Sequence, residues 1–146
     1  MPRLLTLLVL AAALVSGACG GGSWSGAEPP AVDLTGIWVG EITSTTGPPA
    51  YDPNFGTYQM TLELFQSGAN VTGTFHTDIS LTGTVSGWVA GWRTQLSLKF
   101  APCSAFSPGP VNFTGTVSEP GTTMAVQYEG TPCGSVDYGT GTLTRQ

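Results

Sequence analysis

Residues 57–64 read Thr-Tyr-Gln-Met-Thr-Leu-Glu-Leu, an apolar side chain at every second position with a polar one between. The same period of two recurs over residues 95–100 and 124–129. Strict alternation puts the apolar side chains on one face of an extended chain, which is typical of antiparallel strands with one buried face. No stretch of the sequence offers a comparable period of 3.6, so we expect an all-β domain.

Alternation and the turn residues between the runs predict how many strands the domain has. The expected strands cover about 34–42, 57–66, 70–77, 79–87, 92–100, 111–118, 123–129 and 136–145. Consecutive runs are separated mostly by short connections, which is typical of an up-and-down meander. We therefore predict an eight-stranded antiparallel up-and-down barrel over residues 33–146.

A motif with a central glycine recurs inside these runs. Its copies are Leu34–Trp38, Val71–Phe75, Leu81–Val85, Phe113–Val117 and Gly139–Leu143, and four of the five read Thr-Gly-Thr in the middle. Alternation puts the glycines on the inner face and the threonines on the outer face. Inward glycines let a sheet bend sharply and let bulky side chains lie over the backbone. A sheet bent this often is expected to close on itself, which removes its exposed edges.

Composition excludes several classes of protein. Only 9% of the 146 residues are charged and the formal net charge is −5, against 21 glycines and 11 prolines. Helical bundles and coiled coils need faces rich in Glu and Lys, so both are disfavoured. Four basic residues are too few for nucleic-acid binding, which depends on neutralising phosphates.

The first residues have the pattern of an export signal. Arg3 provides a positive charge, an apolar run follows over residues 4–15, and small residues precede a cut after Ala18. Twelve apolar residues are too few to span a bilayer, which needs about twenty. We expect residues 1–18 to be a signal peptide and 19–32 to be a tether rich in Gly, Ser and Pro.

The segment Val15-Ser16-Gly17-Ala18-Cys19 resembles the lipobox of bacterial lipoproteins. The resemblance implies that Cys19 is lipidated and anchors the chain to a membrane, the outer membrane if the source is Gram-negative. The segment departs from the usual pattern, because Ser16 stands where lipoboxes carry Leu. The same spacing also suits ordinary signal peptidase. Its cleavage after Ala18 would leave Cys19 unmodified, in a secreted or periplasmic protein.

The other two cysteines are expected to pair. In an exported protein, Cys103 and Cys133 most simply form one disulfide, the alternative being two buried thiols. In the meander, the connections at 43–56, 101–110 and 130–135 share one end of the barrel, together with a tight turn at Asp78. That arrangement puts both cysteines at the same end.

Three residues near the ends of the barrel chain resemble the signature of the calycins, which include lipocalins and avidins. Gly36 and Trp38 lie in the first expected strand, and Arg145 ends the last. The resemblance implies that the Trp sits near the closed end of a barrel and that the basic residue packs across its ring. It also implies a fold, and no particular ligand.

Catalytic sites find little support in the sequence. His76 is the only histidine, and alternation puts it on the outer face. No spacing of His and Cys suits zinc, and no Ser stands in a nucleophile motif. We expect no enzyme, no metal and no cofactor.

The remaining hypotheses concern binding. The long connection at the first hairpin carries Tyr51 and Phe55, with Tyr58 just beyond it, and Trp88 lies at the opposite rim. These aromatic residues are the candidate binding residues of an envelope module that recognises a protein or a glycan through its long-loop end. The alternative is a lipocalin-like carrier of a small apolar ligand. Inward aromatic residues over the glycines favour a filled interior and therefore the first hypothesis.

Overall fold

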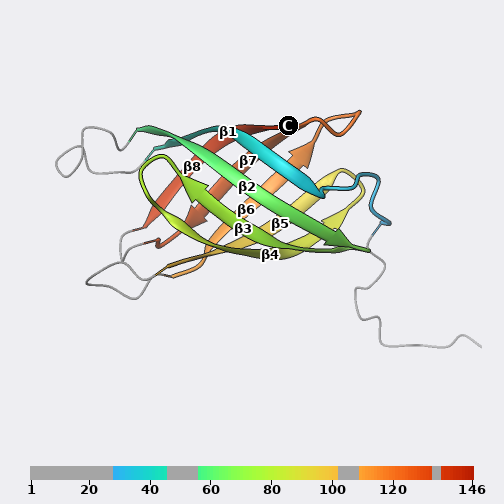
Figure 1. Ribbon diagram of the computed structural model, residues 1–146, viewed down its shortest axis with the longest axis horizontal. Helices are drawn as coiled ribbons and strands as arrows, with labels where there is room; N and C mark the ends of the chain where they lie inside the picture. Colours follow the sequence, from blue (N-terminus) through green and yellow to red (C-terminus); the bar gives the residue numbers. More distant parts are fainter. Residues whose placement is uncertain (1–27, 46–55, 102–108, 133–135) are drawn as a thin grey trace, which may run out of the picture.

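The computed structural model describes residues 28–45, 56–101, 109–132 and 136–146, and these residues form one closed barrel (Figure 1). Its eight strands are β1 (Gly36–Ser44), β2 (Thr57–Ser67), β3 (Asn70–Thr77), β4 (Thr82–Ala90), β5 (Arg93–Phe100), β6 (Val111–Val117), β7 (Thr123–Gly130) and β8 (Asp137–Arg145). Each strand pairs antiparallel with the next, and β8 pairs antiparallel with β1. The predicted eight-stranded up-and-down barrel is confirmed.

Two strands, β1 and β4, begin two or more residues later than the alternation predicted. The fourth strand was expected at 79–87 and lies at 82–90. The reason is a turn over Thr77–Leu81, in which the Thr77 N–H donates to the Leu81 carbonyl at 2.9 Å and Ser80 has a φ of 66°. A positive φ is incompatible with a strand, so residues 79–81 belong to the turn. The expected turn at 88–91 moves accordingly, and follows Ala90.

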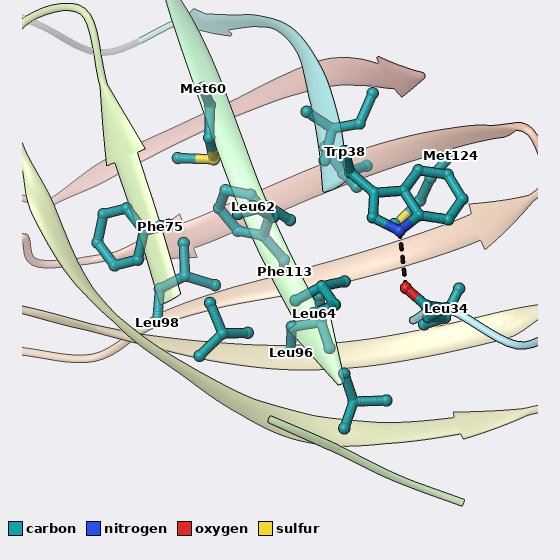
Figure 2. Close-up of a cluster of buried hydrophobic side chains, with 14 of the residues drawn as sticks. Leu34, Trp38, Met60, Leu62, Leu64, Phe75, Leu96, Leu98, Phe113 and Met124 are labelled. Carbon is teal, nitrogen blue, oxygen red and sulfur yellow. Dashed lines mark hydrogen bonds between the residues drawn. The ribbon is translucent and has the colours of Figure 1, made fainter. Parts of the chain in front are cut away.

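The first strand is also displaced, from the expected 34–42 to 36–44. Leu34 is fully buried but lies outside the strand, where its N–H donates to Oε1 of Gln66 at 2.7 Å. Its carbonyl accepts a hydrogen bond of 2.8 Å from Nε1 of Trp38 (Figure 2). Leu34 therefore folds over the end of the barrel, where its side chain is buried beside Trp38.

The barrel interior is apolar, as Figure 2 shows for its central part. Its buried side chains are Leu34, Trp38, Ile42, Met60, Leu62, Leu64, Val71, Phe75, Val85, Val89, Leu96, Leu98, Val111, Phe113, Val117, Met124, Val126, Tyr128 and Leu143. Tyr58, Trp92 and Phe100 are half-buried and pack against this cluster. Every strand contributes to it, so hydrophobic burial and closure of the barrel stabilise the fold together.

Aromatic rings lie over inward glycines, as expected. A Cβ added to Gly83 would come within 2.6 Å of Cε1 of Phe75, and one added to Gly139 within 2.6 Å of Cε1 of Tyr128. Both would lie closer still to carbonyl oxygens of the neighbouring strand. Larger residues at these positions would displace either a ring or a strand. The glycines thus allow strands to approach closely and give the rings their space.

The antiparallel order gives the barrel two different ends. We call one end the closed end. The strands β1, β3, β5 and β7 begin there, and short connections join β2 to β3, β4 to β5 and β6 to β7. Residues 29–31, which composition groups with the tether, are bonded there: the Ala31 N–H donates to the Gly91 carbonyl at 2.9 Å, and the Gly91 N–H donates to the Pro29 carbonyl at 3.1 Å. The opposite end, which we call the mouth, holds the strand ends that the long connections join. Within the described ranges no helix is long and apolar enough to cross a membrane.

Candidate functional site

Four inward polar side chains form a layer across the mouth, above the apolar core. They are Ser44 at the end of β1, Tyr58 near the start of β2, Tyr128 near the end of β7 and Asp137 at the start of β8. Ser44, Tyr128 and Asp137 are buried and Tyr58 is half-buried. We call this set the mouth layer. Each member continues the inward alternation of its own strand, so the period of two is what places it there.

Hydrogen bonds hold the mouth layer together around Asp137. The Ser44 hydroxyl donates to Oδ1 of Asp137 at 2.5 Å, and the Tyr128 hydroxyl donates to Oδ2 at 3.0 Å. Tyr128 also interacts with the Tyr58 phenol, whose pKa it lowers in part. Because β2 and β7 are not neighbours in the barrel, this last interaction crosses the interior. The layer therefore links four strands, and no buried side-chain nitrogen or oxygen of the described residues lacks a partner.

Both tyrosines are held in the neutral form. Burial raises the pKa of Tyr58 to about 12, and the Asp137 carboxylate acts in the same direction. Burial is also the largest cause that raises the pKa of Tyr128, followed by its neighbour Tyr58. A phenol whose pKa is raised is a poor general base near neutral pH. The layer is suited to hydrogen bonding rather than to proton transfer.

A groove on the outside of the barrel reaches the mouth. It consists of two adjoining hollows, of about 660 and 780 Å³, that share Thr114, Gln127 and Thr140. These side chains come from β6, β7 and β8, and they stand next to one another in the strand register. The lining combines hydroxyl and amide groups with the carboxylates of Glu41 and Glu129, and Tyr138 lies near the mouth. It offers hydrogen bonds and one aromatic ring to a neighbouring molecule.

At the closed end, Arg145 lies over the Trp38 ring, with its Cζ 5.9 Å from the ring centroid. Its guanidinium donates to the Asp33 carbonyl at 3.0 Å and to the Thr35 carbonyl. Gly36, the third residue of the expected signature, has a φ of 138°, which favours glycine, and a Cβ there would lie 3.2 Å from Nε of Arg145. Arg145 thus joins the last strand to the segment that leads into β1.

The candidate binding residues do not gather in one place. Tyr58 is part of the mouth layer, whereas Trp88 lies on the outer face near the closed end, where 43% of its surface is exposed. Tyr51 and Phe55 lie outside the described residues, as do Cys19, Cys103 and Cys133. Lipidation and the Cys103–Cys133 disulfide therefore stay predictions. His76 is exposed on β3, on the outer face.

Ser44, Tyr128 and Asp137 were not among the candidate residues predicted from the sequence. The signal was present, because Asp137 has the same parity as Gly139 and Leu143, and Ser44 has the same parity as Trp38. Ending the first strand at residue 42 left Ser44 in a connection. An acidic residue with inward parity next to a barrel mouth is the pattern that would have found Asp137.

Comparisons with known proteins identify no relative of this chain. No family model, no curated protein and no solved structure matches it. In the described part of the chain, no group of three or more His, Cys, Asp or Glu side chains could hold a metal ion. The site is therefore interpreted from its own geometry.

Proposed function

We propose that this chain is an exported, lipid-anchored protein of the bacterial cell envelope that acts as a non-catalytic binding module through the mouth of its barrel. The observation that carries the proposal is the difference between the two ends. The closed end is covered by the chain's own residues 28–35 and Arg145. The mouth carries the mouth layer and adjoins the longest connections.

The geometry favours the mouth over the interior as the place of binding. Phe75 and Tyr128 occupy the inner space over Gly83 and Gly139, and Phe75 packs edge to face on Phe100 with centroids 4.8 Å apart. Protein interiors packed in this way leave little room for a ligand. A carrier of a small apolar molecule would need that space. The mouth, by contrast, has hydroxyl groups at the surface of the core.

The chemistry of the mouth indicates the class of partner. Tyr58 and Tyr128 are neutral donors and acceptors, and they combine an apolar ring with a polar tip. The long connection beside them adds Tyr51 and Phe55 in sequence. Aromatic rings with hydroxyl groups suit partners that are rich in neutral hydrogen-bonding groups, such as glycans and peptides. The resemblance to calycins is consistent with binding without catalysis.

The anchor is tested by the mass of the protein purified from the envelope fraction of a cell that exports it. We expect a chain that begins at Cys19 and carries the added mass of acyl chains, and we expect Cys19→Ser to release the protein from the membrane fraction. An unmodified Cys19 in membrane-associated protein would contradict lipidation and leave secretion as the alternative.

The binding end is tested by NMR titration of the isotope-labelled chain with soluble peptidoglycan fragments, and separately with a fatty acid. If the mouth binds, the fragments shift the amide signals of Ser44, Tyr58 and Asp137, and Tyr58→Phe weakens the interaction. Shifts that spread through core residues such as Leu62 and Leu98 with the fatty acid alone would favour the carrier instead. Fragment-induced shifts confined to the closed end would refute binding at the mouth.

A further inference from the structure

Three large apolar side chains are exposed together near the closed end. Ile37 is 47% exposed at the start of β1, Phe65 is 58% exposed near the end of β2, and Trp88 is 43% exposed near the end of β4. All three point outward from strand ends that meet at the closed end. We call them the apolar rim. Most other outward side chains of the strands are polar, and Tyr138, 48% exposed, is an exposed aromatic side chain at the mouth end.

The surroundings of the apolar rim are mostly uncharged. In the register, Phe65 stands opposite Thr72, and Trp88 stands between Asn70 and Gln95. Glu63 on β2 is a charged neighbour of two members, since it stands opposite Ile37 in the register and two residues before Phe65 on the same face of β2. The chain from Phe65 to Asn70 continues through Gln66, Ser67, Gly68 and Ala69, none of which is charged. Apart from Glu63, the nearest register neighbours of the apolar rim are therefore polar but uncharged.

The chain between the barrel and Cys19 limits how far this rim can lie from a membrane. Residues 29–31 hydrogen-bond to Gly91, in the turn that follows β4. Because Trp88 lies near the end of β4, this bonding fixes residue 28 near the apolar rim. Position 28 lies nine residues along the chain from Cys19. At full extension nine residues span about 30 Å. A lipid on Cys19 would thus keep the closed end, rather than the mouth, next to the bilayer.

We propose that the apolar rim inserts into the interfacial region of a lipid bilayer and fixes the barrel with its mouth directed away from the membrane. The proposal rests on the lipid anchor of the proposed function. Trp is enriched at the boundary between headgroups and acyl chains, where an amphipathic ring is favoured. The anchor provides membrane attachment, and the rim provides orientation.

The charges around the closed end indicate which membrane surface it fits. Among the described residues at this end, the acidic ones are Glu28, Asp33, Glu63 and Glu119, and the basic ones are Arg93 and Arg145. The excess of acidic groups disfavours an anionic lipid surface. We therefore expect the rim to prefer zwitterionic lipid. This preference is the opposite of that of a basic peripheral protein.

Partition into vesicles tests the rim independently of the lipid. The chain from residue 19 onward, carrying Cys19→Ser, is sedimented with phosphatidylcholine vesicles and with vesicles that also contain phosphatidylglycerol. We expect measurable partition into phosphatidylcholine that weakens when phosphatidylglycerol is added at low salt. Phe65→Ser and Trp88→Ser should each lower the partition coefficient about tenfold, since burial of exposed apolar area drives the insertion.

Val136→Ser is the matched control, because Val136 is 64% exposed at the mouth end. We expect it to leave the partition unchanged, and we expect all variants to keep the circular dichroism of the barrel. Trp24→Ser separates a contribution of the tether from that of the rim. No partition of the Cys19→Ser chain, or an equal loss with Val136→Ser, would overturn the proposal.

A second measurement uses the anchored protein. Brominated phosphatidylcholine should quench the fluorescence of Trp88, measured as the difference between the native chain and Trp88→Phe. Absence of this quenching in protein whose acylation has been shown by mass would overturn the rim while leaving the anchor intact. An unmodified Cys19 together with rim-dependent vesicle partition would instead overturn the anchor alone.

Discussion

The two ends of this barrel are closed by different interactions. At the closed end, the guanidinium of Arg145 lies over the buried indole of Trp38, and both groups donate hydrogen bonds to backbone carbonyls. The mouth places a buried carboxylate among hydroxyl groups. The closed end gains most of its stability from apolar burial, whereas the mouth depends on hydrogen bonds that are costly to break singly. The first kind of seal suits a permanent floor, and the proposed function assigns recognition to the second.

The largest effect is expected at the closed end. Trp38→Ala removes a fully buried ring that packs in the core and donates to Leu34, and should cost about 3–5 kcal/mol of the free energy of unfolding. Urea unfolding followed by circular dichroism measures it. Trp88→Ala is the control, since Trp88 is exposed and should cost less than 1 kcal/mol. Similar losses for both variants would contradict a core role for Trp38.

At the mouth, removal of the carboxylate should have the next largest effect. Asp137→Ala leaves the hydroxyls of Ser44 and Tyr128 without their acceptor, and should cost about 2–3 kcal/mol. The same unfolding measurement applies. The double variant Asp137→Ala with Tyr128→Phe should be less destabilised than the two single changes predict together, because it removes both partners of one bond. Strict additivity would show that the two side chains act independently.

High pH should weaken the mouth selectively. The pKa of Tyr58 is raised from the ordinary 10 to about 12, so the folded chain keeps this proton while the unfolded chain loses it. Its stabilisation is therefore complete below pH 10 and falls as the pH rises through 12, by about 2–3 kcal/mol. Unfolding measured between pH 9 and 12 should show this slope, and tyrosinate absorbance should report the late titration. Tyr58→Phe should make the slope shallower, and an unchanged slope would contradict the assignment.

The smallest of the four effects is expected from the cation at the closed end. Arg145→Met removes the charge over Trp38 and the hydrogen bonds to Asp33 and Thr35, and should cost about 1–2 kcal/mol. Arg145→Lys should recover part of this loss, because lysine keeps the charge without the planar fork. Thermal unfolding compares the three chains. If Arg145→Met equalled the native chain, the guanidinium would contribute nothing to closing the barrel.

Prediction from sequence succeeded where a structural signal is local. Tyr58, Met60, Leu62 and Leu64 display their inner face in eight consecutive residues, so strand β2 was placed within one residue of its observed end. The boundaries of β1 and β4 were less accurate. There, Leu34 and Leu81 continue the alternation while the backbone leaves the sheet, because contacts with Gln66 and Thr77 are more favourable than extending the strand.

The candidate site was predicted only in part. Tyr58 was named, and the other members of the mouth layer were not, because Ser44, Tyr128 and Asp137 lie far apart in sequence and meet only across a closed barrel. Trp88 was expected at the rim opposite Tyr58, and it lies there, near the closed end. Alternation predicts whether a side chain points into or out of the barrel. It does not predict which inward side chains of other strands lie next to it.

The sequence by itself determined the class of fold, the number of strands and the inner and outer faces, because a period of two and a glycine at a bend are properties of the chain. Only the tertiary structure decided the register, and with it the hydrogen bonds of Asp137, the position of Arg145 over Trp38 and the collection of Ile37, Phe65 and Trp88 at one end. Those arrangements require strands distant in sequence to be paired in one register, which a closed barrel fixes for all of its strands together.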